Sequence, residues 1–434
     1  MPTASSNASS STLCRLAPPD DLASEITLTS SLHANDVVVV GNSSDAPFAI
    51  DVAYAFGQSE DIADLISMKT FANTEFCPRF ICDESDLTRI GDQLAGKTVI
   101  IVSTSSLTMS RNSLAMRNLL IARAARDNGA AAVVLVEPDL YYSAQDRGPG
   151  VDHGETHFER DIADRKKFDG QPFSARLYAE LLNLAGVDRV LTVHNHSVSV
   201  QAEFSRVFEG RFHNLIPYEL FANYLHNSDI VNFESDGEGL VLCAPDKGAR
   251  DFVRTMYKTL ELPAAKFVML DKVRTGERSV EISLHPESDT AASEIAGHDL
   301  VLFDDMVRTG STVVKSCEFL KTVKPNRTVF AVSHFYASSE GREKMANPAI
   351  DEILTLNTLP TVLNRDVQGR LRKKLVVLKI EQWLAENLSR VLGLPTPPRE
   401  NMYQIDMSSK NPRFKRKIYS NDQLASLRDQ DQLF

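Results

Sequence analysis

The sequence predicts an α/β protein built on parallel sheets. Short apolar runs recur along its 434 residues, and they are continuous rather than alternating, which indicates strands covered on both faces. Helical patterns separate these runs, and such alternation is typical of βαβ units. A chain of this length has room for two domains. We therefore expect two α/β domains with parallel sheets.

The individual strands follow from these apolar runs. They are expected at Asp36–Val40, Thr98–Ser103, Ala131–Val136, Arg189–Val193, Leu240–Ala244, Phe267–Leu270, Leu300–Phe303, Thr328–Val332 and Leu375–Leu378. Helices are expected between them, at 112–127, 174–185, 248–261, 312–322 and 380–393. In the first of these helices Leu114, Leu119, Leu120 and Ala124 fall on one face, which is the pattern of a helix packed on a sheet.

Three segments differ in composition from the rest. Residues 1–12 are rich in Ser without acidic residues or Arg, so residues 1–33 are expected to be a disordered tail rather than a transit peptide. Residues 147–171 are rich in Gly, Asp, Arg and Lys, which predicts a long mobile loop. Residues 395–434 begin with Pro and turn polar, which suggests a C-terminal extension. The two domains are then expected at 34–212 and 213–394.

The overall composition excludes several classes of partner. A net charge of −11 argues against nucleic acid. No apolar run approaches the roughly 18 residues that a membrane helix needs. The five cysteines form no disulfide or zinc pattern, which favours a reducing, cytoplasmic setting. Cys243 and Cys317 lie in apolar elements and are expected in the core.

The most informative stretch is residues 301–312, which read VLFDDMVRTGST. A short buried strand is followed by Asp304 and Asp305, and then by a small-residue turn that opens a helix. The first N–H groups of a helix are unpaired and hold phosphate well. Paired carboxylates can bind sugar hydroxyls or hydrated Mg²⁺. The stretch predicts a site for a phosphorylated ribose, the alternative being an ordinary acidic βα loop.

Other residues supply cations and possible metal ligands. Lys272 and Arg274 are two apart, so an extended backbone puts both on one side, where they could close over phosphates; the alternative is a solvated hairpin. Asp246 follows a strand and a Pro, a position suited to a metal-linked water or a ribose. His194 and His196 are expected to share a face at a strand end. Imidazole suits Zn²⁺ or Mn²⁺ better than Mg²⁺. The alternative interpretation is one metal-binding histidine and one hydrogen-bonded histidine.

Several segments resemble, in order, the motifs of ribose-phosphate pyrophosphokinases (PRPP synthetases) over roughly residues 50–393. Tyr142-Ser143-Ala144-Gln145-Asp146-Arg147 resembles the family's Tyr-Ala-Arg-Gln-Asp-Arg, and His194-Asn195-His196 its Asp-Leu-His. Further similar segments are Ala244-Pro245-Asp246-Lys247-Gly248, Asp271-Lys272-Val273-Arg274, the 304–312 stretch and Asn357-Thr358-Leu359-Pro360. Together they identify the chain as a divergent member.

The resemblance implies a fold and a reaction. The fold would be two similar phosphoribosyltransferase-type (Rossmann-like) domains, with the active site between them and often across a subunit interface. The reaction would transfer the diphosphoryl group of ATP to the C1 hydroxyl of ribose 5-phosphate, giving PRPP and AMP. It implies Mg²⁺ as cofactor, ATP and ribose 5-phosphate as partners, and a homo-oligomer, either a dimer or a hexamer.

The resemblance also implies roles for single residues. Lys272 and Arg274 would be catalytic. ATP would contact Gln145, Asp146 and Arg147, with Phe80 and Glu84 reaching the adenine of a neighbouring subunit. The ribose 5-phosphate site would comprise Asp246, Asp304, Asp305, Arg308, Thr309, Gly310, Ser311 and Thr312. The metal would be held by His196, Asp246 and His194.

Departures from the family pattern leave other functions open. Ala144 stands where the family has an ATP-binding Arg, His194 replaces an Asp, and Arg308 replaces an Asp in the ribose-phosphate loop. These changes bear on nucleotide preference and regulation. One alternative is a non-catalytic paralogue that regulates a PRPP synthetase. The other is a phosphoribosyltransferase that consumes PRPP, which would share the 304–312 loop without needing Lys272 and Arg274.

Overall fold

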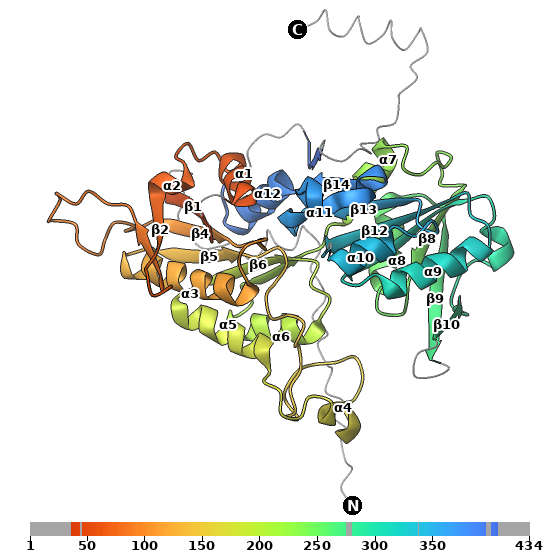
Figure 1. Cartoon of the computed structure of the whole chain (residues 1–434), viewed down its shortest axis with the longest axis horizontal. Coiled ribbons are helices and arrows are strands. Elements are labelled where there is room, and N and C mark those ends of the chain that lie inside the picture. Colours follow the sequence, from red (N-terminus) through yellow and green to blue (C-terminus); the bar gives the residue numbers. More distant parts are fainter. Residues whose placement is uncertain (1–35, 44–45, 275–279, 337, 396–400, 407–434) are drawn as a thin grey trace, which may run out of the picture.

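The described residues form two large sheets that lie side by side, and a small two-stranded one, in the computed structural model (Figure 1). The structure describes residues 36–43, 46–274, 280–336, 338–395 and 401–406. The side chains of residues 272–274, 280 and 281 are outside this description. The predicted tail at 1–33, and most of the 395–434 extension, also lie outside the described residues.

The first sheet has five parallel strands, as expected from apolar runs that are buried on both faces. In spatial order they are β1 (Val37–Gly41), β4 (Thr98–Val102), β5 (Ala132–Val136), β6 (Arg189–Val193) and β7 (Phe212–Leu215). The helices of this half are α1 (Pro47–Ala55), α2 (Ile62–Leu65), α3 (Arg111–Asp127), α4 (Ile162–Lys166), α5 (Ser174–Ala185) and α6 (Val198–Val207). A separate antiparallel hairpin pairs β2 (Ile66–Thr70) with β3 (Phe76–Phe80).

The second sheet has eight strands and a parallel centre. In spatial order they are β10 (Val280–Leu284), β9 (Lys266–Arg274), β8 (Leu240–Ala244), β11 (Asp299–Val307), β12 (Arg327–Phe335), β13 (Glu352–Leu356), β14 (Leu375–Lys379) and β15 (Gln404–Ile405). Only the two outer strands, β10 and β15, pair antiparallel. The helices are α7 (Tyr218–Asn227), α8 (Arg250–Leu260), α9 (Ser311–Thr322), α10 (Ser339–Met345), α11 (Arg365–Gln368) and α12 (Glu381–Val391). Short 3₁₀ turns lie at Ala292–Glu294, Pro360–Leu363 and Gly369–Lys373.

The predicted fold class is confirmed, and each predicted strand and helix is present. The pattern missed β2 (ISMKT) and the edge strand β7 (FHNL), and it also missed β13 (EILTL), a buried central strand in which Glu352 and Thr355 interrupt the apolar run. Such segments lack the continuous apolar run that marks a central strand. Cys243 and Cys317 are buried in the core of the second half, as expected.

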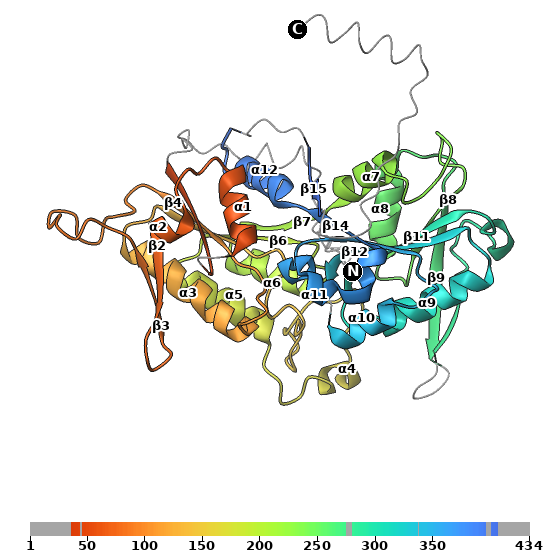
Figure 2. The ribbon, with the colours of Figure 1, turned by 45° about the horizontal axis from the view of Figure 1, so that its top comes forward.

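Elements on both sides of the expected boundaries at 212/213 and 394/395 pack with the neighbouring half or extension. β7 crosses the boundary placed between residues 212 and 213 and belongs to the first sheet. Gln404 and Ile405 of the expected extension pair with β14. α12 lies beside α1 of the first half (Figures 1 and 2), and Lys379 forms an ion pair with Asp51 at 2.7 Å. The halves therefore share packing surfaces.

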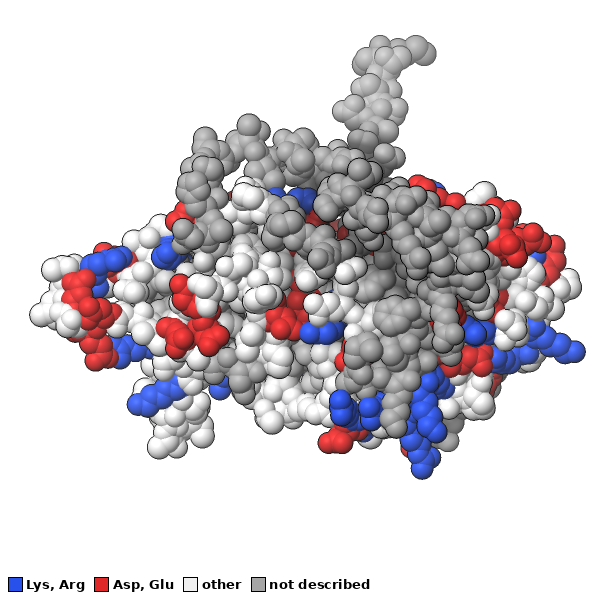
Figure 3. Space-filling view, turned by 90° about the horizontal axis from the view of Figure 1, so that it is seen from above, with Lys and Arg blue, Asp and Glu red and all other residues white. Residues whose placement is uncertain are grey.

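The surface of the described residues shows a mixed charge. In the face drawn in Figure 3, acidic and basic side chains form small separate groups. None of the helices in the described part of the chain combines the length and the apolar character needed to cross a membrane.

Candidate active site

The acidic pair Asp304 and Asp305 lies within a strand rather than after one, which corrects the sequence prediction. β11 continues to Val307 because β12 pairs with it that far. Its other neighbour, β8, pairs only as far as Leu302. The two carboxylates therefore lie where β11 extends beyond β8, at the carboxyl edge of the sheet, where ligands of open α/β sheets bind.

The two neighbouring carboxylates differ in their protonation. The N–H of Asp305 donates to Asp304 Oδ1 at 3.0 Å. Burial, together with the charges of Asp305 and Asp246, raises the pKa of Asp304 well above its usual range. Burial also opposes ionisation of Asp305, but a hydrogen bond from His196 keeps the pKa of Asp305 below its usual range. A cation bound here would favour ionisation of both groups.

His196 connects this acidic pair to the first half of the chain. Its Nδ1 lies 2.6 Å from Asp305 Oδ2. The hydrogen bond to Asp305 is the main cause that raises the pKa of His196, and the charge of Asp146 adds to it. One imidazole thus lies close to carboxylates of both the predicted ribose segment and the predicted ATP segment.

His194 takes a different role, which favours the interpretation of one structural and one site histidine. β6 ends at Val193, so the two histidines lie in a loop and not at i, i+2 on a strand. His194 has a φ of 45°, is buried, and its Nδ1 lies 2.6 Å from Ser333 Oγ. Burial lowers the pKa of His194 to about 3, so the ring is neutral. These contacts give His194 a structural role, and its assignment as a metal ligand stays a prediction.

The predicted phosphate turn opens a helix as expected. Gly310 is the N-cap of α9 with a φ of 75°, a conformation that glycine adopts without a steric penalty. A Cβ on Gly310 would lie 2.9 Å from Met345 Sδ. Thr309 and Thr312 are exposed, and Ser311 is half-buried. The N–H groups of the first turn of α9 can therefore donate hydrogen bonds to a phosphate.

Residues after β12 brace this turn, and sequence reasoning missed them. Lys344 Nζ donates to Ser311 Oγ at 2.6 Å, and Ser338 Oγ donates to the Arg308 carbonyl at 3.3 Å. Gly341 approaches the same carbonyl so closely that a Cβ would lie 2.6 Å from it. The only sequence signal for this brace is a Ser N-cap before the short helix α10. Its role depends on the pairing of β11 with β12.

Asp246 lies between β8 and α8, near the acidic pair. Its Oδ1 accepts N–H groups of Gly248 at 3.0 Å and Ala249 at 3.3 Å. Its charge contributes to the raised pKa of Asp304. The structure thus brings Asp246, Asp304 and Asp305 to one edge of the sheet.

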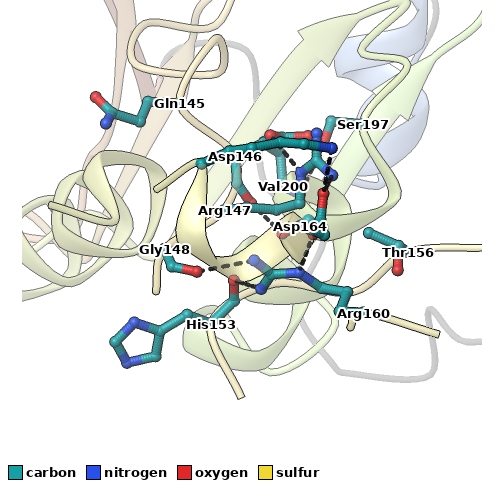
Figure 4. A network of polar contacts seen from close by, with 12 residues as sticks. Gln145, Asp146, Arg147, Gly148, His153, Thr156, Arg160, Asp164, Ser197 and Val200 are labelled. Atoms are coloured by element: carbon teal, nitrogen blue, oxygen red, sulfur yellow. Dashed lines mark hydrogen bonds and ion pairs between the residues drawn. The ribbon is translucent and has the colours of Figure 1, made fainter. Parts of the chain in front are cut away.

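The predicted ATP segment is held by partners within the chain. Gln145 exchanges side-chain hydrogen bonds with Gln171 at 2.9 Å and Ser174 at 3.2 Å. Ser197 Oγ donates to Asp146 Oδ2 at 2.7 Å, which ties the segment to the first turn of α6 (Figure 4). Arg147 bonds to Asp164 at 3.3 Å and lies over the ring of Phe168.

Residues 147–171 contain a buried ionic centre, drawn in Figure 4. Arg160 donates to Asp164 at 2.8 Å and to the carbonyls of Gly148 and His153 at 2.9 Å and 2.6 Å. The side chains of Arg160 and Asp164 are 7% and 8% exposed. The segment contains the short helix α4, and these bonds fold the rest of it against that helix. Asp164 also holds the Arg147 side chain. The segment's mobility in solution stays a prediction.

Phe80 and Glu84 both have contacts within their own chain. Phe80 is 5% exposed and belongs to the core of its own chain, and its contact with a neighbouring subunit's nucleotide stays a prediction. It lines a cavity of about 310 Å³ with Val38 and Gln58, at the opposite end of β1 from the carboxyl edge. Glu84 is exposed and pairs with Arg79 at 2.9 Å.

Lys272 and Arg274 lie on β9, and their side chains are outside the described residues. β9 runs parallel to β8, with Ala244 opposite Met269. The backbone therefore carries residues 272 and 274 past the end of β8, at the same edge as Asp246. β10 pairs antiparallel with this part of β9 to form a hairpin.

Among the described residues, no three His, Cys, Asp or Glu side chains converge as a ready metal cage. The set His196, Asp246 and His194 is therefore not a preformed three-ligand site. Mg²⁺ nevertheless needs only one or two carboxylates when waters and substrate phosphates complete its shell. The carboxylates of Asp246, Asp304 and Asp305 fit that requirement better than the imidazoles do.

The second half belongs to a known class of domain. Residues 220–356 match the family model of the phosphoribosyl transferase domain. This range contains the acidic pair and the phosphate turn. The class defined by the fold and site is thus the phosphoribosyltransferase-type α/β proteins.

Curated relatives are similar to a larger part of the chain than this domain alone. It is 26% identical over 327 residues to ribose-phosphate pyrophosphokinase of Corynebacterium efficiens, covering 75% of this chain and 84% of that protein. It is 26% identical over 281 residues to ribose-phosphate pyrophosphokinase 2 of Saccharomyces cerevisiae, covering 64% and 76%. The fold is similar to the crystal structure of phosphoribosylpyrophosphate synthetase from Mycobacterium smegmatis, with a TM-score of 0.61, 21% identity and coverage of 82% and 99%. Most of the chain is thus similar to ribose-phosphate pyrophosphokinases, at about 26% identity.

Proposed function

We propose that the protein transfers the diphosphoryl group of ATP to the C1 hydroxyl of ribose 5-phosphate, releasing AMP. The observation that carries this proposal is the contact of His196 with Asp305 at 2.6 Å. It joins the half that holds the predicted ATP segment to the half that holds the phosphate turn. Two substrates bound to these two halves would meet at this contact.

Different residues would bind the two substrates. The N–H groups at Gly310–Thr312 would hold the 5-phosphate, and Asp304 and Asp305 would bind the ribose hydroxyls. Gln145, Asp146 and Arg147 would contact ATP. Phosphoryl transfer needs positioning and charge neutralisation more than covalent help from the protein. Lys272 and Arg274 would supply mobile cations for the moving phosphoryl oxygens.

Magnesium ion is the proposed cofactor. Asp246 and the acidic pair would hold it through oxygen atoms or waters, with His196 beside them. When bound, it would neutralise charge on the phosphate oxygens of ATP. Support comes from the raised pKa of Asp304, which reflects burial and crowded carboxylates that a cation would relieve.

A direct assay tests this function. The protein is incubated with ATP, Mg²⁺ and ribose 5-phosphate, and AMP is measured. AMP formed only when the sugar is present supports the proposal, whereas ADP would indicate a simple kinase. A protein without turnover that accelerates a partner synthetase would be the regulatory paralogue. Consumption of PRPP with a nucleobase would indicate a phosphoribosyltransferase.

A further inference from the structure

A second contact between the halves lies outside the residues assigned to the substrates. The Tyr336 hydroxyl donates to the Asp139 carboxylate, at 2.9 Å from Oδ1 and 3.0 Å from Oδ2. Asp139 follows β5 of the first half, and Tyr336 follows β12 of the second. Asp139 is 6% exposed, so water does not satisfy its charge. Burial, and then the charge of Asp139, raise the pKa of Tyr336, which keeps its hydroxyl a donor.

On the first half, this contact holds the start of α3. Arg111 forms an ion pair with Asp139. Its guanidinium carbon lies 5.1 Å from the ring centre of Tyr141 and 5.3 Å from that of Tyr336, within the range of cation–π contacts. The next residue, Asn112, accepts the hydroxyl of Tyr142 at 2.9 Å. Tyr141 and Tyr142 lead directly into the predicted ATP segment at Gln145–Arg147.

On the second half, Tyr336 holds the start of the phosphate turn. Its N–H donates to the Val307 carbonyl at 3.1 Å. The Arg308 guanidinium carbon lies 5.6 Å from the Tyr336 ring centre. Arg308 is exposed and precedes Thr309, the first residue of the turn. Its charge also acts on His196, which places it near the acidic pair.

We propose that Tyr336 is a positioning residue with two separable functions: its hydroxyl sets the ATP segment against the phosphate turn, and its ring holds Arg308 toward the sugar phosphate. The inference rests on the proposed function. Arginine stays charged at all accessible pH values and suits phosphate. Arg308 would therefore add a phosphate contact on the sugar side of this chain, which lacks a guanidinium at Ala144 on the nucleotide side.

Two substitutions separate the functions. Tyr336→Phe keeps the ring and removes the hydroxyl, whereas Tyr336→Leu removes both. Tyr257→Phe is the matched control, because its hydroxyl bonds to the Pro263 carbonyl on the surface. For each full-length variant we would measure kcat and KM, the Kd of ribose 5-phosphate by calorimetry, and the melting temperature.

The expected results differ between the variants. Tyr336→Phe should lower kcat by about tenfold, since a hydrogen bond to a charged group is lost, with the Kd of ribose 5-phosphate changed by less than about twofold. Tyr336→Leu should lower kcat similarly and also weaken ribose 5-phosphate binding by about tenfold, as expected when a cation–π contact no longer orders Arg308. The control should match the wild type.

A double-mutant cycle tests the coupling to Arg308. Arg308→Gln should weaken ribose 5-phosphate binding about as much as Tyr336→Leu does, and the double variant should be no weaker, because both remove one contact. If the two substitutions instead weakened ribose 5-phosphate binding by additive free energies, Tyr336 and Arg308 would not be coupled. Equal binding losses in Tyr336→Phe and Tyr336→Leu would overturn the separation of functions, and so would lower melting temperatures with unchanged kcat and Kd. A wild type that forms no AMP would refute the proposed function, yet the binding cycle would still test the contact with Arg308.

Discussion

His196 Nδ1 and Asp305 Oδ2 face each other at 2.6 Å across the junction of the two halves. The imidazole comes from the loop after β6 and the carboxylate from β11, more than a hundred residues later in the chain. Their hydrogen bond raises the pKa of His196 and lowers that of Asp305 against the effect of burial. The pair therefore favours a charged imidazolium and a charged carboxylate.

Removal of this imidazole should alter the metal dependence. In His196→Ala, Asp305 loses its hydrogen-bonded partner, and we expect the Mg²⁺ concentration for half-maximal activity to rise. The measurement is a Mg²⁺ titration of AMP formation at saturating substrates. His298→Ala is the control, because His298 lies before the amino end of β11. An unchanged Mg²⁺ requirement would remove His196 from the site.

Gly310→Ala should impair sugar binding beyond its effect on stability. The φ of 75° and the close approach to Met345 Sδ both oppose a Cβ there. We expect a loss of about 1 kcal/mol of stability from the backbone alone, and a rise in KM for ribose 5-phosphate. Gly297→Ala is the matched control, since its φ is 77° but no atom lies within 4 Å of the added Cβ. Equal KM values in the two variants would contradict the phosphate role of the turn.

Lys272→Ala should slow the chemical step far more than it weakens sugar binding. A cation that contacts the moving phosphoryl group interacts most strongly in the transition state, so kcat should fall while the Kd of ribose 5-phosphate stays near its normal value. Lys266→Ala, at the other end of β9, serves as control. A loss of affinity with an unchanged kcat would exclude the catalytic role.

Asp164→Asn should loosen residues 147–171 and weaken ATP binding. Asp164 accepts bonds from the buried Arg160 and the half-buried Arg147, and the neutral amide cannot balance these two cations. Limited proteolysis should cut this segment faster, and the Kd of a non-hydrolysable ATP analogue should rise. Asp169→Asn, an exposed partner of Lys166, is the control. Tighter nucleotide binding in Asp164→Asn would mean instead that Asp164 competes with ATP for Arg147.

Glu137 should give the protein a pH-dependent stability. The carboxyl is buried, and burial raises its pKa to about 8 although Ser103, Asn118, Tyr178 and the N–H of Tyr141 all donate to it. The folded state then keeps a proton that the unfolded state releases above its ordinary pKa near 4.5. Stability from this group is present at low pH and is lost as the pH rises toward 8.

Comparison with Glu137→Gln isolates this effect. The wild type should lose stability relative to the variant between pH 5 and 8, by at most about 1.4 kcal/mol per pH unit. Urea unfolding at several pH values measures the difference. A constant difference over this range would show that Glu137 is ionised in the folded protein.

Local sequence determined most of the central strands, several of the helices and the turn that opens α9, but it did not reveal β13 or the helices α1, α6 and α7. Continuous apolar runs favour burial on both faces, so the strands β4, β5 and β8 could be predicted from the sequence alone. The turn at Gly310 was equally clear, because a glycine in the left-handed conformation before a helical pattern is a local requirement. The acidic pair and Asp246 could each be seen to follow an apolar run, whereas the strand order showed that they lie at one edge of the sheet.

Only the tertiary structure decided which distant groups meet. His194 and His196 are two residues apart and look equivalent in the sequence, yet packing against Ser333 buries one while the other faces Asp305. The contacts of Tyr336 with Asp139 and of Lys344 with Ser311 likewise depend on strand order and on how the halves pack. Hydrogen bonds and burial act through space over a few ångströms, whereas sequence periodicity reports only neighbours along the chain.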